Sequence, residues 1–409
     1  MAVLLDYIKW RSDLSFNQDP FNELDAVVLT QLIYTDMKTF FSGYLDEAGS
    51  QDSFTLRELA EKTKKEADLK ILNADYDQSK DDYNAFFYLA SESKRYGDIL
   101  VSSYTDILDN ENDTQYAAAI FCLSDKEKFI AFRGTDESLT GWKEDFMISY
   151  TITRSQKLAM DYVKQALRKD RDSSFYISGH SKGGNLAIIA GISLKDDDLK
   201  RIKHIYDLDG PGLADFVYEE LNMAEKNIYN RIDKITTRIS PCYCVVGRIF
   251  EAGFSDSRIV NSTAKGIKKA VGQHSLISWK VNHLKFELAD EYDKSSVWAG
   301  KIFDEWLSKQ TLDDRKIFVD DIFNTLSDAG IKSLRDISAN GLKGFKKIIE
   351  ARAELSDLTK DMAAQLPKTG LSKIEKRRKN RIDILQKKLK SFSEFSIKAR
   401  NYIRIDDRQ

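Results

Sequence analysis

The chain has 409 residues, of which 42% are hydrophobic and 31% charged, and its formal net charge is −2. Its 20 glycines and 4 prolines exclude collagen-like and low-complexity classes, and the length corresponds to about two or three domains. No apolar run approaches the roughly 20 residues that span a bilayer, and the start lacks the basic and apolar segments of a secretory signal. The 3 cysteines, an odd number, favour a reducing compartment. We therefore expect a cytoplasmic protein, with signal-independent export left open.

The pattern of apolar residues changes near residue 98. Residues 1–100 are expected to be mostly helical, because apolar residues recur at helical spacing. Helices are also predicted at Gln156–Arg168 and from the glycine-rich turn after Ser178 through Leu194. The β-rich runs are Tyr116–Leu123, Lys128–Phe132, Phe146–Thr153, Phe175–Ser178, His204–Leu208 and Ile235–Ile239. This alternation predicts an α/β fold with a largely parallel sheet.

The β-rich runs cease after Trp306, and charged helical patterns follow. We divide the chain into an α/β domain at residues 1–305 and an all-helical module at residues 306–409. Residues 366–409 hold 14 Lys and Arg against 5 Asp and Glu, a local charge of +9. They include an amphipathic helix that either packs on the first domain or contacts an anionic membrane peripherally. Nucleic-acid binding is not expected, because aromatic residues do not interleave with the basic ones and no known motif accompanies them.

The most informative motif is Gly179-His-Ser-Lys-Gly183, between a β-rich run and an apolar helix. This Gly-x-Ser-x-Gly context is that of a nucleophile elbow, in which a strained turn presents the serine hydroxyl and glycines avoid clashes. The helix that starts near Lys182 would offer free backbone N–H groups to an oxyanion. Ser181 is therefore the candidate nucleophile; the alternative is an ordinary glycine-rich turn.

A second segment, Phe132-Arg-Gly-Thr135, ends a predicted strand. In open α/β sheets ligands bind at the carboxyl edge of the strands, so Thr135 could donate its N–H, its hydroxyl or both to an oxyanion. The alternative is a turn capped by Thr135, with Arg133 in a structural ion pair.

Taken together, Phe-Arg-Gly-Thr, the following Trp142 and Asp145, and Gly-His-Ser-Lys-Gly-Gly resemble the class 3 lipase superfamily of α/β hydrolases. More narrowly, segments 10–16, 20–25, 209–212, 273–274 and 278–279 resemble a bacterial lipase-like family of unknown function. The resemblance covers about residues 1–285. It implies an α/β-hydrolase fold, with a largely parallel central sheet flanked by helices, and a Ser-His-Asp hydrolase that needs no cofactor.

A serine hydrolase also needs a histidine base and a carboxylate. His180 lies inside the elbow and looks structural in this family, and His204 precedes a strand, at the wrong edge of the sheet. His274, in an expected loop after Gly272, is favoured over His283.

The acid does not stand where class 3 lipases usually carry it. The strand ending at Ile239 continues into Ser-Pro-Cys-Tyr-Cys244 without a carboxylate. Asp209 ends the previous strand, before Gly-Pro-Gly, and is the preferred acid, with Asp207 as the alternate. The sequence thus predicts a catalytic Ser181, His274 and Asp209, with an oxyanion hole at Thr135 and Lys182.

The leading hypothesis is a serine ester hydrolase that acts on a lipid or another acyl ester. Two alternatives stay open: a catalytically silent binding or scaffold protein, motivated by the altered acid position, and an exported lipase toxin whose helical module binds a partner. No metal site is expected, because Cys242 and Cys244 lack a second thiol pair or nearby histidines. The acyl-chain length, the presence of a lid and the oligomeric state are not readable.

Overall fold

Eight strands form one sheet, in the same order as they occur along the chain. The computed structural model describes residues 2–35, 37–38, 41, 53–65, 80–136, 138–221, 228–264, 269–328, 330–333 and 359–360. Neighbouring strands are antiparallel from β1 to β4 and parallel from β4 to β8. The strands are β1 (Phe54–Thr55), β2 (Leu100–Asp109), β3 (Thr114–Ser124), β4 (Glu127–Phe132), β5 (Ser174–His180), β6 (Ile202–Leu208), β7 (Thr236–Pro241) and β8 (Asp256–Val260).

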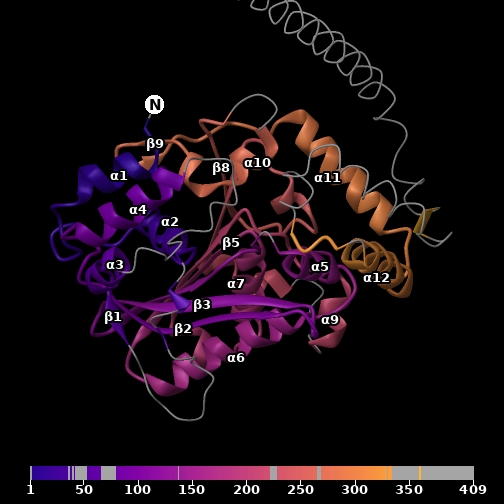
Figure 1. The fold of residues 1–409 in the computed structure, drawn as a ribbon, viewed down its shortest axis with the longest axis horizontal. Helices are drawn as coiled ribbons and strands as arrows, with labels where there is room; N and C mark the ends of the chain where they lie inside the picture. Colours follow the sequence, from indigo (N-terminus) through magenta and orange to yellow (C-terminus); the bar gives the residue numbers. More distant parts are fainter. Residues whose placement is uncertain are drawn as a thin grey trace, which may run out of the picture. The chain divides into compact units, whose positions relative to one another are not determined.

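Helices cover both faces of this sheet, as Figure 1 shows. Those on the first face are α1 (Leu4–Arg11), α2 (Glu23–Leu32), α3 (Leu56–Lys65) and α4 (Lys80–Glu92). Those on the second face include α6 (Arg154–Lys169), α7 (Lys182–Ile192) and α9 (Phe216–Glu220). The remaining helices are α5 (Leu139–Met147), α8 (Asp196–Leu199), α10 (Lys269–His274), α11 (Lys294–Leu307) and α12 (Leu312–Asp328), and a small hairpin pairs β9 (Val281–Asn282) with β10 (Lys285–Phe286).

The order of the strands explains this division of the helices. Successive side chains of a strand point to opposite faces, so Ala118 and Ile120 of β3 pack toward α6 and α7, whereas Ala119 and Phe121 pack toward the N-terminal helices. Crossovers between parallel strands are right-handed, so strands added in one direction carry all their connecting helices on one face. The other face of the sheet therefore needs cover from elsewhere, and α1–α4 supply it.

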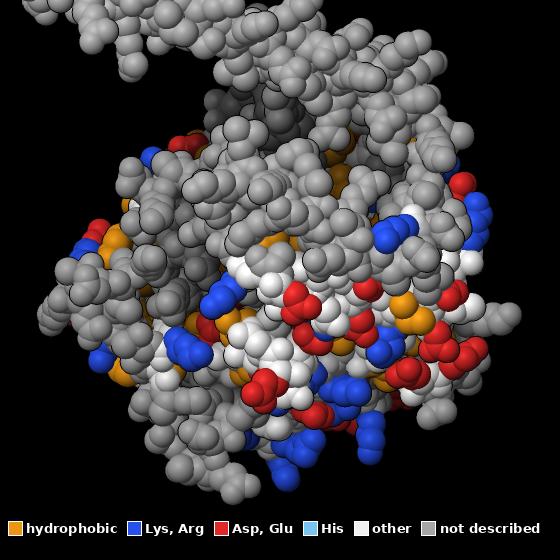
Figure 2. Space-filling model, turned by 45° about the vertical axis from the view of Figure 1, so that its right-hand side comes forward, with side chains coloured by type: hydrophobic (Ala, Val, Ile, Leu, Met, Phe, Trp, Pro, Cys, Tyr) orange, Lys and Arg blue, Asp and Glu red, His pale blue; other side chains and the backbone are white. Residues whose placement is uncertain are grey.

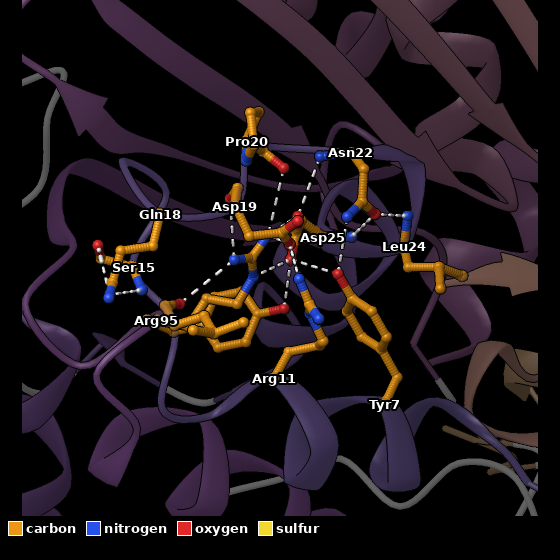
Figure 3. A network of polar contacts seen from close by, with 12 residues as sticks. Tyr7, Arg11, Ser15, Gln18, Asp19, Pro20, Asn22, Leu24, Asp25 and Arg95 are labelled. Atoms are coloured by element: carbon orange, nitrogen blue, oxygen red, sulfur yellow. Dashed lines mark hydrogen bonds and ion pairs between the residues drawn. The ribbon is translucent and has the colours of Figure 1, made fainter. Parts of the chain in front are cut away.

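A buried polar network holds the N-terminal helices together (Figure 3). The Asp25 carboxylate, at the start of α2, forms a two-pronged ion pair with Arg95, at 2.6 and 2.7 Å, and both side chains are buried. Tyr7 and Tyr96 also donate their hydroxyls to Asp25, at 3.1 and 2.6 Å. The Arg95 guanidinium further binds the carbonyl oxygens of residues 14, 19 and 20. This network ties α1, α2 and the segment after α4 into one unit.

Most of the predicted elements are present, and the α/β-hydrolase fold expected from the resemblance is the observed one. The prediction of a strand at Phe146–Thr153 is wrong, because these residues include the end of α5 and the turn after it. Ser138 caps α5 by accepting the N–H of Gly141, and the ring of Phe146 packs against Phe323 of α12, with centroids 5.5 Å apart. Phe146 thus packs on a distant helix, whereas Ile152 belongs to the core on the second face of the sheet.

The chain divides into two compact units, Met1–Ser356 and Asp357–Gln409. The boundary predicted at residue 305 falls inside the first unit, where Lys143 of α5 pairs with Asp320 of α12 at 3.3 Å and Arg315 donates to the carbonyl oxygen of Ser149. Most of the predicted C-terminal module, including residues 366–409, lies outside the described residues and stays a prediction.

Charges of both signs are mixed on one face of the described part of the chain. On the face drawn in Figure 2, Lys and Arg side chains are interspersed with Asp and Glu. Among the described helices, none combines the length and the apolar character that crossing a bilayer requires.

The Asp25 network predicts a large loss of stability in Arg95→Met. This change strands the Asp25 carboxylate in the core without its cation, which should lower the free energy of unfolding by about 3–5 kcal/mol. Arg154→Met, which breaks the more exposed pair with Asp109, is the matched control and should cost about 0–1 kcal/mol. Urea unfolding followed by circular dichroism measures both, and equal losses would show that the network does not hold the N-terminal helices.

Candidate active site

The turn between β5 and α7 has the backbone of a nucleophile elbow. Ser181 adopts φ 58° and ψ −130°, a region that side-chain-bearing residues rarely occupy. A Cβ on Gly179 would lie 1.9 Å from the carbonyl oxygen of Gly183, and one on Gly183 would lie 2.2 Å from that of Phe132. The two glycines of the motif are therefore required by close backbone contacts, and the strain is concentrated on Ser181.

The helix that follows points its free backbone N–H groups at the elbow. Lys182 is the first residue of α7, so its N–H has no acceptor within the helix. Its side chain is buried elsewhere: the ammonium pairs with Glu144 at 2.9 Å and donates to the backbone and side-chain oxygens of Gln115. Lys182 thus offers only its backbone N–H to the elbow.

The structure brings His274 and Asp209 together. The Nδ1 atom of His274 lies 2.6 Å from Oδ2 of Asp209, and both side chains are buried. Asp209 directly follows β6 and has φ 52°, so the backbone turns sharply there. His274 is not in a loop, as expected, but is the last residue of the short helix α10. Its ring contacts that of His180 in a tilted arrangement, with centroids 4.5 Å apart, and His180 directly precedes Ser181.

A thiol occupies the place where the sequence lacks the usual acid. Cys244 follows β7 and donates its S–H to the other carboxylate oxygen of Asp209, at 2.9 Å. Burial, and the charge of Asp209 beside it, hold the pKa of the Cys244 thiol well above its usual value, so the thiol stays protonated and remains a donor. Asp209 therefore accepts one hydrogen bond from His274 and one from Cys244.

Asp207, the alternate acid, has other partners. Arg238 donates to one of its carboxylate oxygens at 2.5 Å, and the N–H of Gly210 donates to the other at 3.0 Å. Burial is the main cause that raises the pKa of Asp207 to about 6, against the attraction of Arg238. This buried pair supports the turn that carries Asp209 rather than facing the His274 ring.

Thr135 lies beside the elbow, held by a carboxylate. Its hydroxyl donates to Asp145 of α5 at 2.6 Å, which leaves the backbone N–H as the donor that Thr135 offers to a reacting group. Its neighbour Arg133 pairs with Asp106 at 2.8 Å, the structural ion pair that the sequence left as an alternative. Burial raises the pKa of Asp145 to about 6, whereas Lys182 and the hydrogen bond from Thr135 act to lower it.

The two remaining histidines lie away from Ser181. The Nε2 atom of His204, near the start of β6, is 2.8 Å from the hydroxyl of Thr237. His283 is exposed and stacks on Trp10. Among the described residues, no group of three or more His, Cys, Asp or Glu side chains is arranged to hold a metal ion.

Two residues near the site were missed by the sequence analysis. The segment that holds Cys244 was considered for a zinc site and for a carboxylate, but Cys244 was not considered as a hydrogen-bond donor to the acid. Tyr34, whose hydroxyl lies 2.7 Å from Nδ1 of His180, stands in no motif and sits 146 positions away. Only a fold that places α2 beside β5 could have revealed it.

The raised pKa of Asp145 predicts a pH-dependent difference between wild type and Asp145→Asn. An acid whose pKa is higher in the folded state binds its proton more tightly there, so its contribution to stability is present at low pH and is lost as pH rises. The unfolding free energy of the wild type minus that of Asp145→Asn should therefore fall, by at most about 3 kcal/mol, between about pH 4 and pH 6. Asp207, which titrates in the same range, is common to both proteins and cancels.

Urea unfolding of both proteins between pH 4 and pH 8 measures this difference. If the difference in unfolding free energy does not change with pH, or grows as pH rises, the pKa of Asp145 is not raised in the folded protein.

Comparisons with known proteins place the chain in a sequence family. The sequence model of the Mbeg1-like family matches residues 90–324, more than half of the chain. A search of curated proteins found no match. Among solved structures, the M37 lipase is 16% identical, over 56% of this chain and 70% of its own, with a TM-score of 0.33. A mutant form of MDLA from Penicillium cyclopium is 14% identical, over 70% of this chain and 96% of its own, with a TM-score of 0.34.

The assignment of the fold rests on the strand order and on the elbow at Ser181 in this chain itself. The chain belongs to the Mbeg1-like family and has an α/β-hydrolase fold.

Proposed function

We propose that this protein is a serine hydrolase that cleaves a lipid or another acyl ester, with Ser181 as nucleophile, His274 as base and Asp209 as acid. The observation that carries the proposal is the hydrogen bond from His274 to Asp209, formed by a ring that contacts the ring of His180, the residue before the strained Ser181. A strained serine, an imidazole and a buried carboxylate in this order are the parts of an acyl-transfer site.

The reaction follows from these positions. With Nδ1 donating to Asp209, Nε2 of His274 is the nitrogen that takes the proton of Ser181 as Oγ attacks the ester carbonyl. The backbone N–H groups of Lys182 and Thr135 stabilise the negative oxygen that forms, and each such donor contributes about 10²–10³ in kcat. His274 then gives the proton to the leaving alcohol. In the second half of the reaction water attacks the acyl-enzyme and gives its proton to His274, which returns it to Oγ of Ser181 as the acid leaves.

The hydrogen bond to Asp209 also weakens the silent-scaffold alternative. That alternative was motivated by the missing carboxylate after β7, and here the carboxylate after β6 contacts the histidine instead. Peripheral contact of residues 366–409 with an anionic membrane, a toxin-like export route and the cytoplasmic location stay predictions from the sequence, the first of them for residues outside the described part of the chain.

Fluorophosphonate labelling tests the nucleophile. Because these reagents phosphonylate an activated serine, the folded wild type should be labelled, and Ser181→Ala should lose all labelling. Ser193→Ala, at the other end of α7, removes a hydroxyl that caps only the carbonyl oxygen of Ala190 and should label at the wild-type rate. Absence of labelling in a folded wild type would refute the proposed activity.

Hydrolysis of p-nitrophenyl esters of increasing chain length distinguishes the two candidate acids. In Asp209→Asn the amide cannot hold His274 with its proton on Nδ1, so kcat should fall by about 10³–10⁴ with little change in fold. Asp207→Asn removes the partner of the buried Arg238, and its main effect should be a lower melting temperature. Retention of activity in Asp209→Asn, or its loss only in a stably folded Asp207→Asn, would move the acid to Asp207.

A further inference from the structure

His180, the residue before the nucleophile, uses both of its ring nitrogens. Its Nε2 atom lies 2.8 Å from the carbonyl oxygen of His274, and its Nδ1 atom lies 2.7 Å from the hydroxyl of Tyr34. A carbonyl oxygen can only accept, so Nε2 carries the proton and Nδ1 accepts the hydroxyl proton of Tyr34. Burial, and the nearby His274, hold the pKa of His180 well below its ordinary value, in keeping with a neutral ring.

The Tyr34 hydroxyl contacts a second part of the site. It accepts the backbone N–H of Gly134 at 3.1 Å, and Gly134 directly precedes Thr135. The fit around Gly134 is close: a Cβ there would lie 2.5 Å from the carbonyl oxygen of His180, 2.6 Å from the Tyr34 hydroxyl and 2.9 Å from Cβ of Ser181. Three hydrogen bonds in sequence therefore run from the Thr135 segment, through Tyr34 and His180, to the backbone of His274.

The position of Tyr34 is set by α2 and its anchors. At the N-terminus of α2, Asp25 is held by Arg95, Tyr7 and Tyr96. Figure 3 labels the first two of these partners. Four residues before Tyr34, Thr30 lies 2.7 Å from the hydroxyl of Ser178, which is two residues before His180 on β5. Residues two apart on a strand share a face, so Thr30 and Tyr34 meet the same side of β5.

These contacts connect the segments that carry the proposed nucleophile, base and oxyanion donor. The role inferred from them rests on the proposed function. We propose that Tyr34 is a positioning residue, whose hydroxyl holds the Thr135 segment and the His180 ring, and through that ring the His274 backbone, in the geometry of acyl transfer. Tyr34 lies outside the region that matches the family model. The N-terminal segment thus contributes to the active site as well as covering the sheet.

Loss of the Tyr34 hydroxyl should affect the rate because an acyl-transfer site tolerates only small displacements of its catalytic groups. Without the hydroxyl, the Gly134 N–H and the Nδ1 atom of His180 both lose this partner in a buried place, and each can regain one only by moving. A displacement of about 1 Å in a catalytic group can cost about 10² in rate. The loss should fall on the chemical step, because no substrate contact is removed.

The test compares Tyr34→Phe with Tyr162→Phe in the full chain. Tyr162 is a buried tyrosine of α6 whose hydroxyl donates to the carbonyl oxygen of Ser103, so its change also removes a hydrogen bond, here a partly buried one. For Tyr34→Phe we expect the rate of fluorophosphonate labelling and kcat for a p-nitrophenyl ester to fall about 10–100-fold, with KM changed less than about threefold. Tyr162→Phe should keep wild-type rates at a similar melting temperature.

The outcomes separate this inference from the proposed function. If the wild type is not labelled, the proposed function fails; if the wild type is labelled and Tyr34→Phe reacts as fast as Tyr162→Phe, only the role of Tyr34 fails. A loss that lies wholly in KM would likewise overturn it.

A spectroscopic measurement keeps the inference testable if Tyr34→Phe does not fold. In folded Ser181→Ala protein, ¹⁵N NMR of the His180 ring should show a neutral imidazole with its proton on Nε2 at neutral pH. A ring protonated on Nδ1, or on both nitrogens, could not accept from Tyr34 and would overturn the inference.

Discussion

The direction in which the sheet grows determines much of this structure. From β4 to β8, parallel strands are added one after another on the same side, so the right-handed crossovers carry α6, α7 and α9 onto one face. The opposite face, lined by residues such as Ala119 and Phe121, would remain open without α1–α4. A chain of this topology therefore needs its N-terminal segment to complete the core. The buried Asp25–Arg95 pair fastens that segment internally.

The same arrangement assembles the site at the carboxyl edge of the parallel strands. Ser181 follows β5, Asp209 follows β6, Cys244 follows β7, and Thr135 follows β4. Only His274 comes from outside the strand ends, on α10, and it is tied to the edge through Asp209 and through His180. Ser181, Asp209, Cys244 and Thr135 each follow the end of a strand, so the sheet sets the spacing of these four residues. The loops that carry them set only the orientation of the side chains.

Sequence patterns predicted those parts whose chemistry is local. Gly179 and Gly183 indicate the elbow because their backbones lie too close to other backbone atoms to leave room for a Cβ. Asp209 was chosen as the candidate acid because it stands at the end of a predicted strand next to the elbow. The strand predicted at Phe146–Thr153 is wrong because Phe146 lies in the last turn of α5 and packs on α12, which is distant in sequence. Tyr34 and Cys244 were missed because their contacts, with His180 and Asp209, exist only after α2 and β7 are placed in the fold.

A crystal structure of the protein inactivated by a fluorophosphonate tests the account most directly. We expect phosphorus bonded to Oγ of Ser181, the phosphoryl oxygen within hydrogen-bond distance of the N–H groups of Lys182 and Thr135, and Nδ1 of His274 still on Asp209. Phosphorus on a different side chain, or a His274 ring turned away from Asp209 while Ser181 carries the adduct, would contradict the catalytic assembly described above.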